Sequence, residues 1–322
     1  MTMTNPFPYS FDHKRYHSWN YHLKKKFGEK IFKVALDGGF DCPNRDGTVA
    51  FGGCTFCSAA GSGDFAGDRS DDLVTQFNEV KNRMHQKWPQ AKYIGYFQAY
   101  TNTHAPVDEL REKYETILKQ DNVIGLSIGT RPDCLPNDVV DYLAELNQRT
   151  YLWVELGLQT IHQKTSDLIN RAHDMDCYLN GVDKLRKHGI NVCSHIINGL
   201  PGEDYHMMME TAKAVSEMDV QGIKIHMMHL LKGTPMVKQY EKGMLTFMTR
   251  EQYIELVVDQ LEILPKEMII HRITGDGPPE LLIGPMWSMS KWEVLNAIDQ
   301  EFAKRDSYQG KHFNKRPQVL PC

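Results

Sequence analysis

Short apolar runs alternate with amphipathic stretches along most of this chain. The apolar runs predict strands at 31–36, 91–98, 123–129, 150–158, 190–198 and 221–229. The stretches between them predict helices near 70–87, 106–119, 136–147, 162–188 (as two helices), 204–218 and 249–264. Strands that alternate with helices are typical of βαβ units and a parallel sheet, so the pattern predicts an α/β fold.

The helix at 249–264 has the clearest predicted start. Thr249 stands before it and Gln252 follows three residues later, which is the spacing of a capping box. Its apolar side chains recur at helical spacing, at Ile254, Val257 and Leu261.

Several predicted strands carry polar residues on one face, unlike ordinary buried parallel strands, which are apolar on both. These residues are Ser127 and Arg131 in 123–131, Glu155 and Gln159 in 151–159, Cys193 and His195 in 190–198, and Lys224 and His226 in 221–229. His229 has the opposite parity to Lys224, so we expect it at the periphery. The alternation predicts a partial (β/α)6 barrel with a polar interior that holds ligands at the carboxyl ends of the strands. We expect this barrel at 31–240, between a basic N-terminal segment at 1–30 and a C-terminal α/β extension at 241–322.

The bulk composition, 41% hydrophobic and 24% charged, is that of a globular protein with a sizeable core. No apolar run approaches the roughly 18 residues that cross a bilayer, and the N-terminus lacks the layout of a signal peptide. We therefore expect a cytoplasmic protein without membrane attachment.

The net charge of −4 is unevenly distributed. Residues 1–33 carry seven Lys or Arg against Asp12 and Glu29, and residues 301–322 carry five against Glu301 and Asp306. Basic ends on an acidic body suggest a polyanionic partner such as nucleic acid, although solvated terminal helices would give the same pattern.

Three of the seven cysteines lie in a glycine-rich loop after the first predicted strand. Cys42, Cys54 and Cys57 have the spacing C-x11-C-x2-C. Three thiolates can hold three irons of a 4Fe–4S cluster and leave the fourth iron open to the amino and carboxylate groups of S-adenosylmethionine (SAM). Phe56 is placed to lie against the adenine. The alternative is structural zinc, whose fourth ligand would be Cys134 or a histidine.

Motifs further along strengthen the cluster interpretation. They are FDCPNRDG at 40–47, GTRPD at 129–133, ELGLQT at 155–160 and GLPGE at 199–203. With them, residues 28–230 resemble the radical SAM superfamily, in the branch of the Elongator catalytic subunit and the oxygen-independent coproporphyrinogen oxidases. The resemblance implies a radical SAM enzyme with a 4Fe–4S cluster and SAM as cofactors.

The resemblance also implies roles for single residues. Gln159 and His195 are expected to contact SAM, and Arg131 to lie near its ribose. Arg171, expected on the next helix, would pair with the methionyl carboxylate. The motif that usually contacts the methionyl amine is glycine-rich, but here it reads FQAYTN at 97–102, so Gln98 or another group must make that contact. Ser127 and Glu155 complete the predicted cofactor-binding set.

Lys224 and His226 are the predicted catalytic residues, because their inward face suits an anionic substrate or a proton transfer. The segment HRITGDG at 271–277 is a candidate lid or substrate loop, although a plain turn fits equally.

The subgroup resemblance suggests a substrate: tRNA with 5-carboxymethylaminomethyl(-2-thio)uridine at the wobble position, converted to the 5-aminomethyl form. Hydrogen abstraction beside the nitrogen, oxidation to an imine and hydrolysis would release glyoxylate. Lys224, Arg131 or Arg272 would hold the substrate carboxylate, and flavodoxin or ferredoxin would supply electrons. The alternatives are a radical SAM oxidoreductase acting on a small molecule, as coproporphyrinogen oxidases do, and a non-catalytic iron–sulfur or zinc module that binds nucleic acid.

Overall fold

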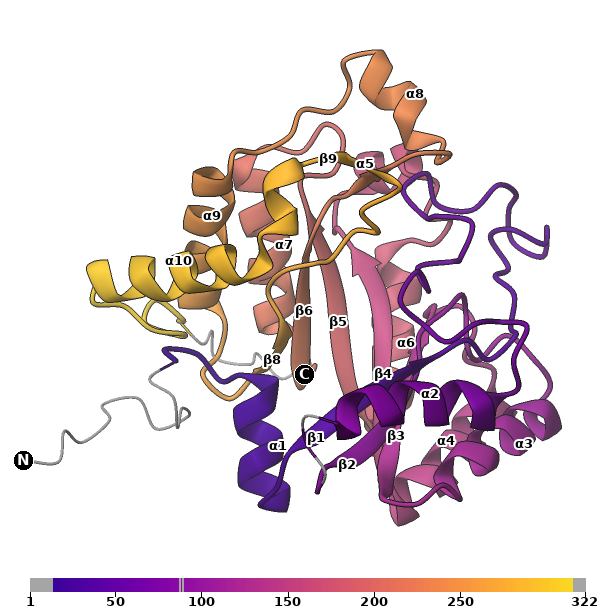
Figure 1. The fold of residues 1–322 in the computed structure, drawn as a ribbon. Helices are drawn as coiled ribbons and strands as arrows, with labels where there is room; N and C mark the ends of the chain where they lie inside the picture. The colour runs from indigo at the N-terminus through magenta and orange to yellow at the C-terminus, as the bar shows by residue number, and fades with distance from the viewer. Residues whose placement is uncertain (1–13, 87, 89, 315–322) are drawn as a thin grey trace, which may run out of the picture.

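A curved parallel sheet forms an incomplete barrel in the computed structural model, which describes residues 14–86, 88 and 90–314 (Figure 1). Its strands, in spatial order, are β1 (Ile31–Leu36), β2 (Lys92–Phe97), β3 (Val123–Thr130), β4 (Tyr151–Gln159), β5 (Asn191–Asn198), β6 (Gly222–Met227) and β8 (Ile269–Arg272). All neighbouring pairs are parallel. The predicted α/β partial barrel is therefore confirmed, and β8 adds a seventh strand to the six expected.

Helices cover the outer face of the sheet, as the alternating pattern predicts (Figure 1). They are α2 (Leu73–His85), α3 (Val107–Leu118), α4 (Asn137–Arg149), α6 (Met175–Lys187), α7 (Tyr205–Glu217) and α9 (Arg250–Ile263), whereas the short α5 (Gln163–Leu168) lies at the carboxyl end of the sheet. The expected division of 162–188 into two helices is confirmed by α5 and α6. The capping box is also confirmed, because Thr249 and Gln252 exchange both hydrogen bonds at the start of α9.

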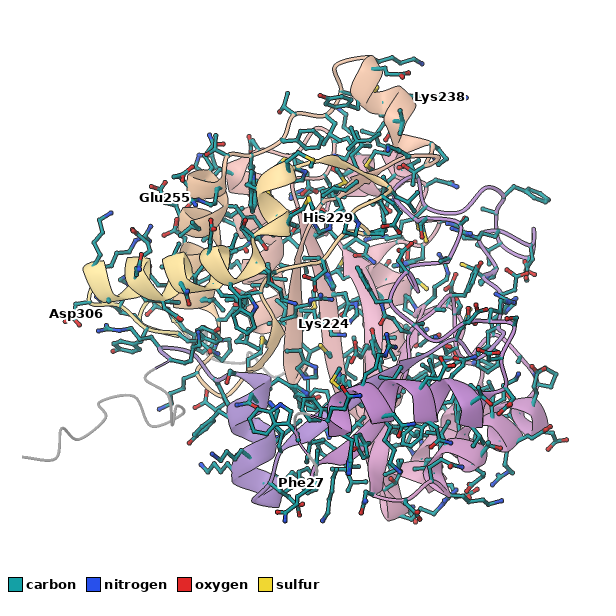
Figure 2. All side chains as sticks on the ribbon, viewed as in Figure 1. Phe27, Lys224, His229, Lys238, Glu255 and Asp306 are labelled. Atoms are coloured by element: carbon teal, nitrogen blue, oxygen red, sulfur yellow. The ribbon has the colours of Figure 1, made fainter. Side chains whose placement is uncertain are left out.

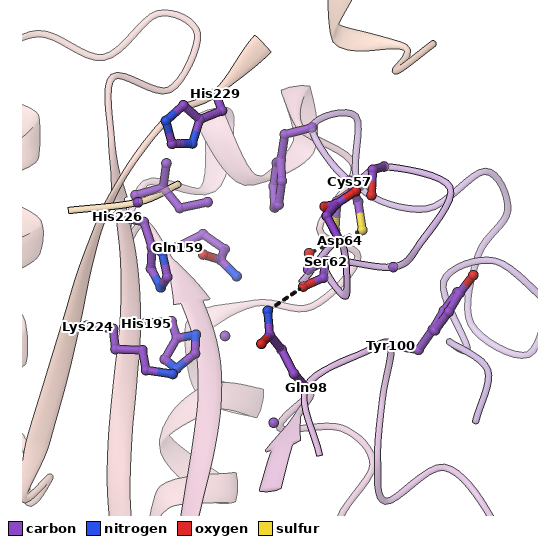
Figure 3. A pocket seen from close by; sticks show the side chains of 18 of the residues that line it. Cys57, Ser62, Asp64, Gln98, Tyr100, Gln159, His195, Lys224, His226 and His229 are labelled. Carbon is purple, nitrogen blue, oxygen red and sulfur yellow. Dashed lines mark hydrogen bonds between the residues drawn. The ribbon is translucent and has the colours of Figure 1, made fainter. Parts of the chain in front are cut away.

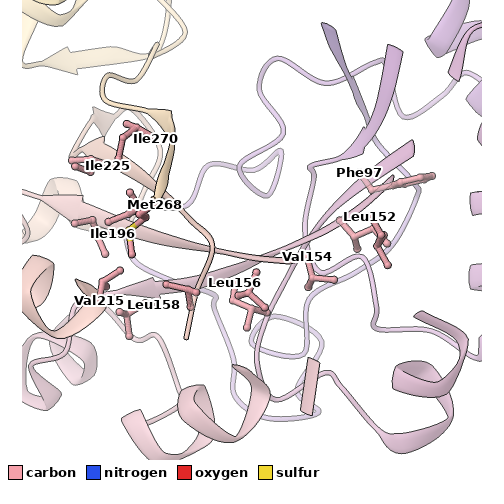
Figure 4. Packing of buried hydrophobic residues seen from close by; sticks show 14 of the residues in the cluster. Phe97, Leu152, Val154, Leu156, Leu158, Ile196, Val215, Ile225, Met268 and Ile270 are labelled. Atoms are coloured by element: carbon pink, nitrogen blue, oxygen red, sulfur yellow. The ribbon is translucent and has the colours of Figure 1, made fainter. Parts of the chain in front are cut away.

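The apolar face of β4 packs beneath these helices. Leu152, Val154, Leu156 and Leu158 are completely buried there (Figure 4). Burying such a side chain contributes about 1.5–3 kcal/mol. The opposite face of β4 is thereby fixed toward the barrel interior.

The segment before β1 closes the amino end of the barrel. Helix α1 (Trp19–Phe27) lies below the strands, and Ser18 forms a bridge with Ile270 of β8 (Figure 1). The Trp19 ring lies 4.0 Å from His271 and 5.3 Å from Trp153, between ring centroids.

The chain beyond residue 240 supplies β8 to the barrel sheet and covers one side of the molecule. Helix α10 (Lys291–Lys304) packs on α9. A small antiparallel ribbon pairs β7 (Leu230–Leu231) with β9 (Leu282–Gly284), and the short helices α8 (Met236–Glu241) and η1 (Met286–Met289) flank it. No helix among the described residues has the length and apolar character that crossing a membrane requires.

The basic ends of the chain are partly neutralised within the fold. Lys14 pairs with Asp299, and Arg305 pairs with Asp259 and Glu301. Lys33, counted among the terminal charges, faces the barrel interior instead, because its neighbours Val34 and Leu36 turn toward the helices. Asp12, Lys315, Arg316 and Cys322 lie outside the described residues.

Candidate active site

The carboxyl ends of the strands surround a cavity of about 290 Å³. The cysteine loop (37–72, between β1 and α2) forms one wall, and the loop 273–278 after β8 forms another. Lys224, His226 and His229 follow one another on one side, and Cys57 and Gln98 lie across from them (Figure 3). Every predicted site residue lines this cavity except Ser127: Cys42, Cys54, Phe56, Cys57, Gln98, Arg131, Glu155, Gln159, Arg171, His195, Lys224 and His226.

The path of the cysteine loop depends on glycine at two consecutive positions. Gly52 and Gly53 have φ values of 82° and 73°, which glycine adopts without strain. A Cβ at Gly53 would also approach the Arg45 side chain to 2.8 Å. Asn170, on the segment after α5, fixes the loop by donating to the carbonyl oxygens of Phe51 and Gly53.

The thiols of Cys42, Cys54 and Cys57 are half-buried, and none is in a disulfide. Burial raises the pKa of Cys57, and it raises the pKa of Cys54 to about 12. Three thiol donors on one wall of one cavity fit an iron–sulfur cluster, whose irons take thiolate ligands. Within the described residues, no three His, Cys, Asp or Glu side chains converge on one metal-ion position.

Arg171 lies on the loop after α5, not on a helix as predicted, because α5 ends at Leu168. Its guanidinium donates to the carbonyl oxygens of Leu158, Thr160 and His173. Burial lowers its pKa to about 10, and no carboxylate of the described residues forms an ion pair with it. A buried cation without a counter-ion is costly, so this wall of the cavity fits an anionic group such as the methionyl carboxylate.

Three other residues are predicted to contact the cofactor, and two of them already form hydrogen bonds within the protein. The Arg131 guanidinium binds both carboxylate oxygens of Asp133, at 2.9 and 2.6 Å, and also the carbonyl oxygen of Arg171. Gln98 donates to the carbonyl oxygen of Ser62 at 2.8 Å (Figure 3). Gln159 ends β4 with a φ of 65°, next to an irregularity in the pairing with β5. Arg131 therefore already holds the segment that carries Arg171, and Gln98 already holds the cysteine loop. Gln159 is instead turned toward the cavity.

A buried polar group, hereafter the Glu155 cluster, occupies the barrel interior. It consists of Glu155, Lys33, Lys224, His195 and Ser127. One carboxylate oxygen accepts from Lys33 and Ser127, and the other accepts from Lys224 and from His195, whose Nε2 lies 2.7 Å away. Ser127 is thus separated from the cavity by Glu155, so the contact predicted between Ser127 and the cofactor finds no support in this placement.

The Glu155 cluster carries one carboxylate and two ammonium groups. Burial would raise the pKa of Glu155, but Lys224 and Lys33 outweigh it and hold that pKa well below its usual range. Burial lowers the pKa of Lys33 to about 8 and that of His195 to about 4. Lys33 was missed from the sequence, although the alternation Ile31, Lys33, Ala35 against Phe32, Val34, Leu36 places it on the inner face.

His229 lines the cavity, so its predicted peripheral position is wrong. The strand β6 ends at Met227, and strand parity does not extend beyond that residue. Burial lowers the pKa of His229 to about 4. The ring packs on the loop 273–278, where a Cβ at Gly275 would lie 2.8 Å from it.

Two further cavity residues, His173 and Asp276, had no predicted role of their own, although Asp276 lies in the segment 271–277 that was a candidate lid or substrate loop. His173 lies beside Arg171, with Nε2 3.1 Å from the carbonyl oxygen of Gly157. Asp276 on the loop 273–278 accepts from Arg272 and from Lys291. Neither residue belongs to a strand of the barrel, so the alternation that revealed the other site residues gave no signal for them.

Comparison with known proteins assigns this arrangement to a class. Residues 45–215 match the family described as the Radical SAM superfamily, and residues 220–304 match the Radical_SAM C-terminal domain. The chain belongs to the radical SAM superfamily and is a radical SAM enzyme whose cofactors are a 4Fe–4S cluster and SAM. This membership sets aside structural zinc and the non-catalytic module.

Three individual proteins show how similar the chain is to known relatives. It is 73% identical to the YtqA protein of Bacillus subtilis, over 98% of both chains. It is 26% identical to a tRNA uridine(34) acetyltransferase of Methanocaldococcus jannaschii, over 50% of this chain and 30% of the relative. The fold resembles Methanocaldococcus infernus Elp3, with a TM-score of 0.65 at 16% identity. That match covers 87% of this chain but only 64% of the Elp3 chain.

Proposed function

We propose that this enzyme converts 5-carboxymethylaminomethyluridine, or its 2-thio form, to the 5-aminomethyl nucleoside at the wobble position of tRNA. The observation that carries the proposal is the cationic cavity beside the cysteine loop, which suits a substrate with one carboxylate. The conversion takes up water and releases glyoxylate. Of the two hydrogen atoms lost, one would pass to the 5′-deoxyadenosyl radical, and the other would leave as a proton and an electron that the cluster would take up. The amine nitrogen stays on the uridine.

Cofactor binding is assigned to residues of both cavity walls. Cys42, Cys54 and Cys57 would ligate the cluster, and Arg171 would offset the methionyl carboxylate. Phe56, Gln159 and His195 would complete the SAM pocket. When bound, the cluster and SAM supply the 5′-deoxyadenosyl radical.

The cavity residues nearest the strand ends would transfer a proton to or from the substrate nitrogen. Burial holds the pKa of His226 well below its ordinary value, so its imidazole is neutral at physiological pH. Its Nε2 has no hydrogen-bond partner among the described residues. A neutral imidazole with a free nitrogen can exchange a proton with the amine as the C–N bond breaks. Lys224, held by Glu155 and Tyr96, would orient the substrate beside it.

The tRNA part of the proposal is supported by the relatives named as tRNA uridine(34) acetyltransferases, which match half of this chain. A single-stranded anticodon base can be splayed out of its loop and inserted into such a cavity. Low-potential electrons would come from a flavodoxin or a ferredoxin in the cytoplasm.

The direct test is anaerobic incubation of reconstituted enzyme with SAM, reductant and tRNA carrying the carboxymethylaminomethyl group. Nucleoside mass spectrometry should show that carboxymethylaminomethyluridine is replaced by aminomethyluridine. With the Cys57→Ala variant, carboxymethylaminomethyluridine should remain unchanged. Survival of the nucleoside, together with turnover of a free small molecule such as a porphyrinogen, would contradict the proposal.

A further inference from the structure

Five cationic side chains besides histidine line the cavity: Arg45, Arg131, Arg171, Lys224 and Arg272. Three of them are committed to partners inside the fold, and the fourth, Arg171, is already assigned to the methionyl carboxylate. Arg45 and Arg171 donate to backbone carbonyl oxygens, Arg131 pairs with Asp133, and Lys224 pairs with Glu155. Arg272 differs, because within the described residues it makes one hydrogen bond, to Asp276 Oδ2 at 2.6 Å.

The partner of Arg272 is shared with a second cation. Lys291, the first residue of α10, donates to the same Asp276 oxygen at 2.6 Å. One carboxylate therefore serves two cations, which leaves one positive charge in excess. The side chains of Arg272, Asp276 and Lys291 are 31%, 35% and 35% exposed, so a ligand can reach this charge.

The position of this group is fixed by its surroundings. Arg272 ends β8, and the β6–β8 pairing places it opposite Lys224. The loop that carries Asp276 rests on His229, where glycine is needed at position 275. Arg272 and Asp276 therefore face the cavity from the wall formed by β8 and the loop 273–278, whereas Lys291 does not line the cavity and acts through Asp276.

We propose that Arg272, with Lys291 and Asp276 beside it, binds the carboxylate of the modified uridine and makes the enzyme selective for an anionic substituent. This inference rests on the proposed function. A guanidinium presents paired N–H donors that match a carboxylate, and Asp276 holds them in place until the substrate carboxylate replaces it. A phosphate of the RNA backbone has related chemistry, so the test separates the two anions.

The test measures binding of short anticodon stem-loop RNAs to reconstituted enzyme with SAM and without reductant. One RNA carries carboxymethylaminomethyluridine, and the other carries its methyl ester, which lacks the negative charge. We expect the wild-type enzyme to bind the carboxylate form roughly tenfold more tightly, as a charge-assisted contact typically gives. Arg272→Gln should lose this preference and Lys291→Gln should weaken it, whereas Asp276→Asn should keep or increase it.

Arg186→Gln is the matched control, because Arg186 also pairs with one carboxylate, that of Asp219, but lies on α6 away from the cavity. Equal weakening of both RNAs by Arg272→Gln would indicate a backbone phosphate and overturn the inference, and so would an unchanged preference in that variant. Conversion of the modified tRNA by wild-type enzyme is scored separately. The proposed function can therefore stand when this inference fails.

Discussion

Single residues decide the chemistry of this enzyme, and the three loop cysteines come first. Each is assigned a separate iron, so changing Cys42, Cys54 or Cys57 to Ala should abolish the visible absorption of a reconstituted 4Fe–4S cluster. Cys177→Ala is the control, since Cys177 is also half-buried but lies outside the cavity. Iron content near four per protein in any of the three loop variants would contradict the assignment.

Glu155 is the residue on which the barrel interior depends most. Glu155→Gln would leave Lys33 and Lys224 without their counter-ion, and removing one partner of a buried ion pair costs about 3–5 kcal/mol. Glu145→Gln removes an exposed pair with Arg111 and should cost less than about 1 kcal/mol. The two free energies of unfolding, measured in urea, should differ accordingly. Equal losses would show that the Glu155 cluster is not structurally important.

At the scale of elements, α1 closes the barrel through Trp19. The Trp19 ring contacts His271 and Trp153, and Lys33 lies 4.6 Å above it. Trp19→Ala should therefore destabilise the protein by roughly 3 kcal/mol, the lower end for loss of a large aromatic side chain. Trp88→Ala, on a more exposed indole, should have a much smaller effect on the urea midpoint. A stable Trp19→Ala variant would mean that α1 is a peripheral attachment.

The strands and helices also show which residue positions the sequence pattern can predict. Strict alternation in the longer strands predicts from the sequence alone that Glu155 and Lys224 lie on the inner face, where the structure has them. It failed where strands are short or have ended. The four-residue β8 carries too little pattern to separate from a turn, and His229 lies beyond the end of β6. Arg171 was expected on a helix because it falls within the helical pattern at 162–188, but α5 stops three residues earlier.

At the scale of the whole molecule, seven histidines of the described chain have a lowered pKa because they are buried. They are His17, His22, His173, His195, His226, His229 and His271. The unfolded chain therefore binds more protons below pH ~6.5, the ordinary value for histidine, so stability is full above that pH and lost toward pH 4. Urea unfolding of cofactor-free protein between pH 7.5 and 5 should show this fall, and a flat profile would contradict it.

The whole molecule also limits how the proposed RNA substrate can approach. The lysine-rich end of α1 lies at the foot of the barrel, whereas Lys224 and His229 lie inside it, above Phe27 of α1 (Figure 2). Phosphates close to the reacting base therefore cannot rest on α1. An RNA long enough to reach both places would still bind with a strong dependence on salt.

The central claim is that the cavity brings the carbon between the nitrogen and the carboxylate of the modified wobble uridine to a SAM-derived radical. The most direct measurement uses tRNA whose carboxymethylaminomethyl group carries two deuterium atoms on that carbon. Anaerobic turnover should give aminomethyluridine, monodeuterated glyoxylate and 5′-deoxyadenosine that contains one deuterium, all detected by mass spectrometry. Deuterium-free 5′-deoxyadenosine with an intact modified nucleoside would contradict the account.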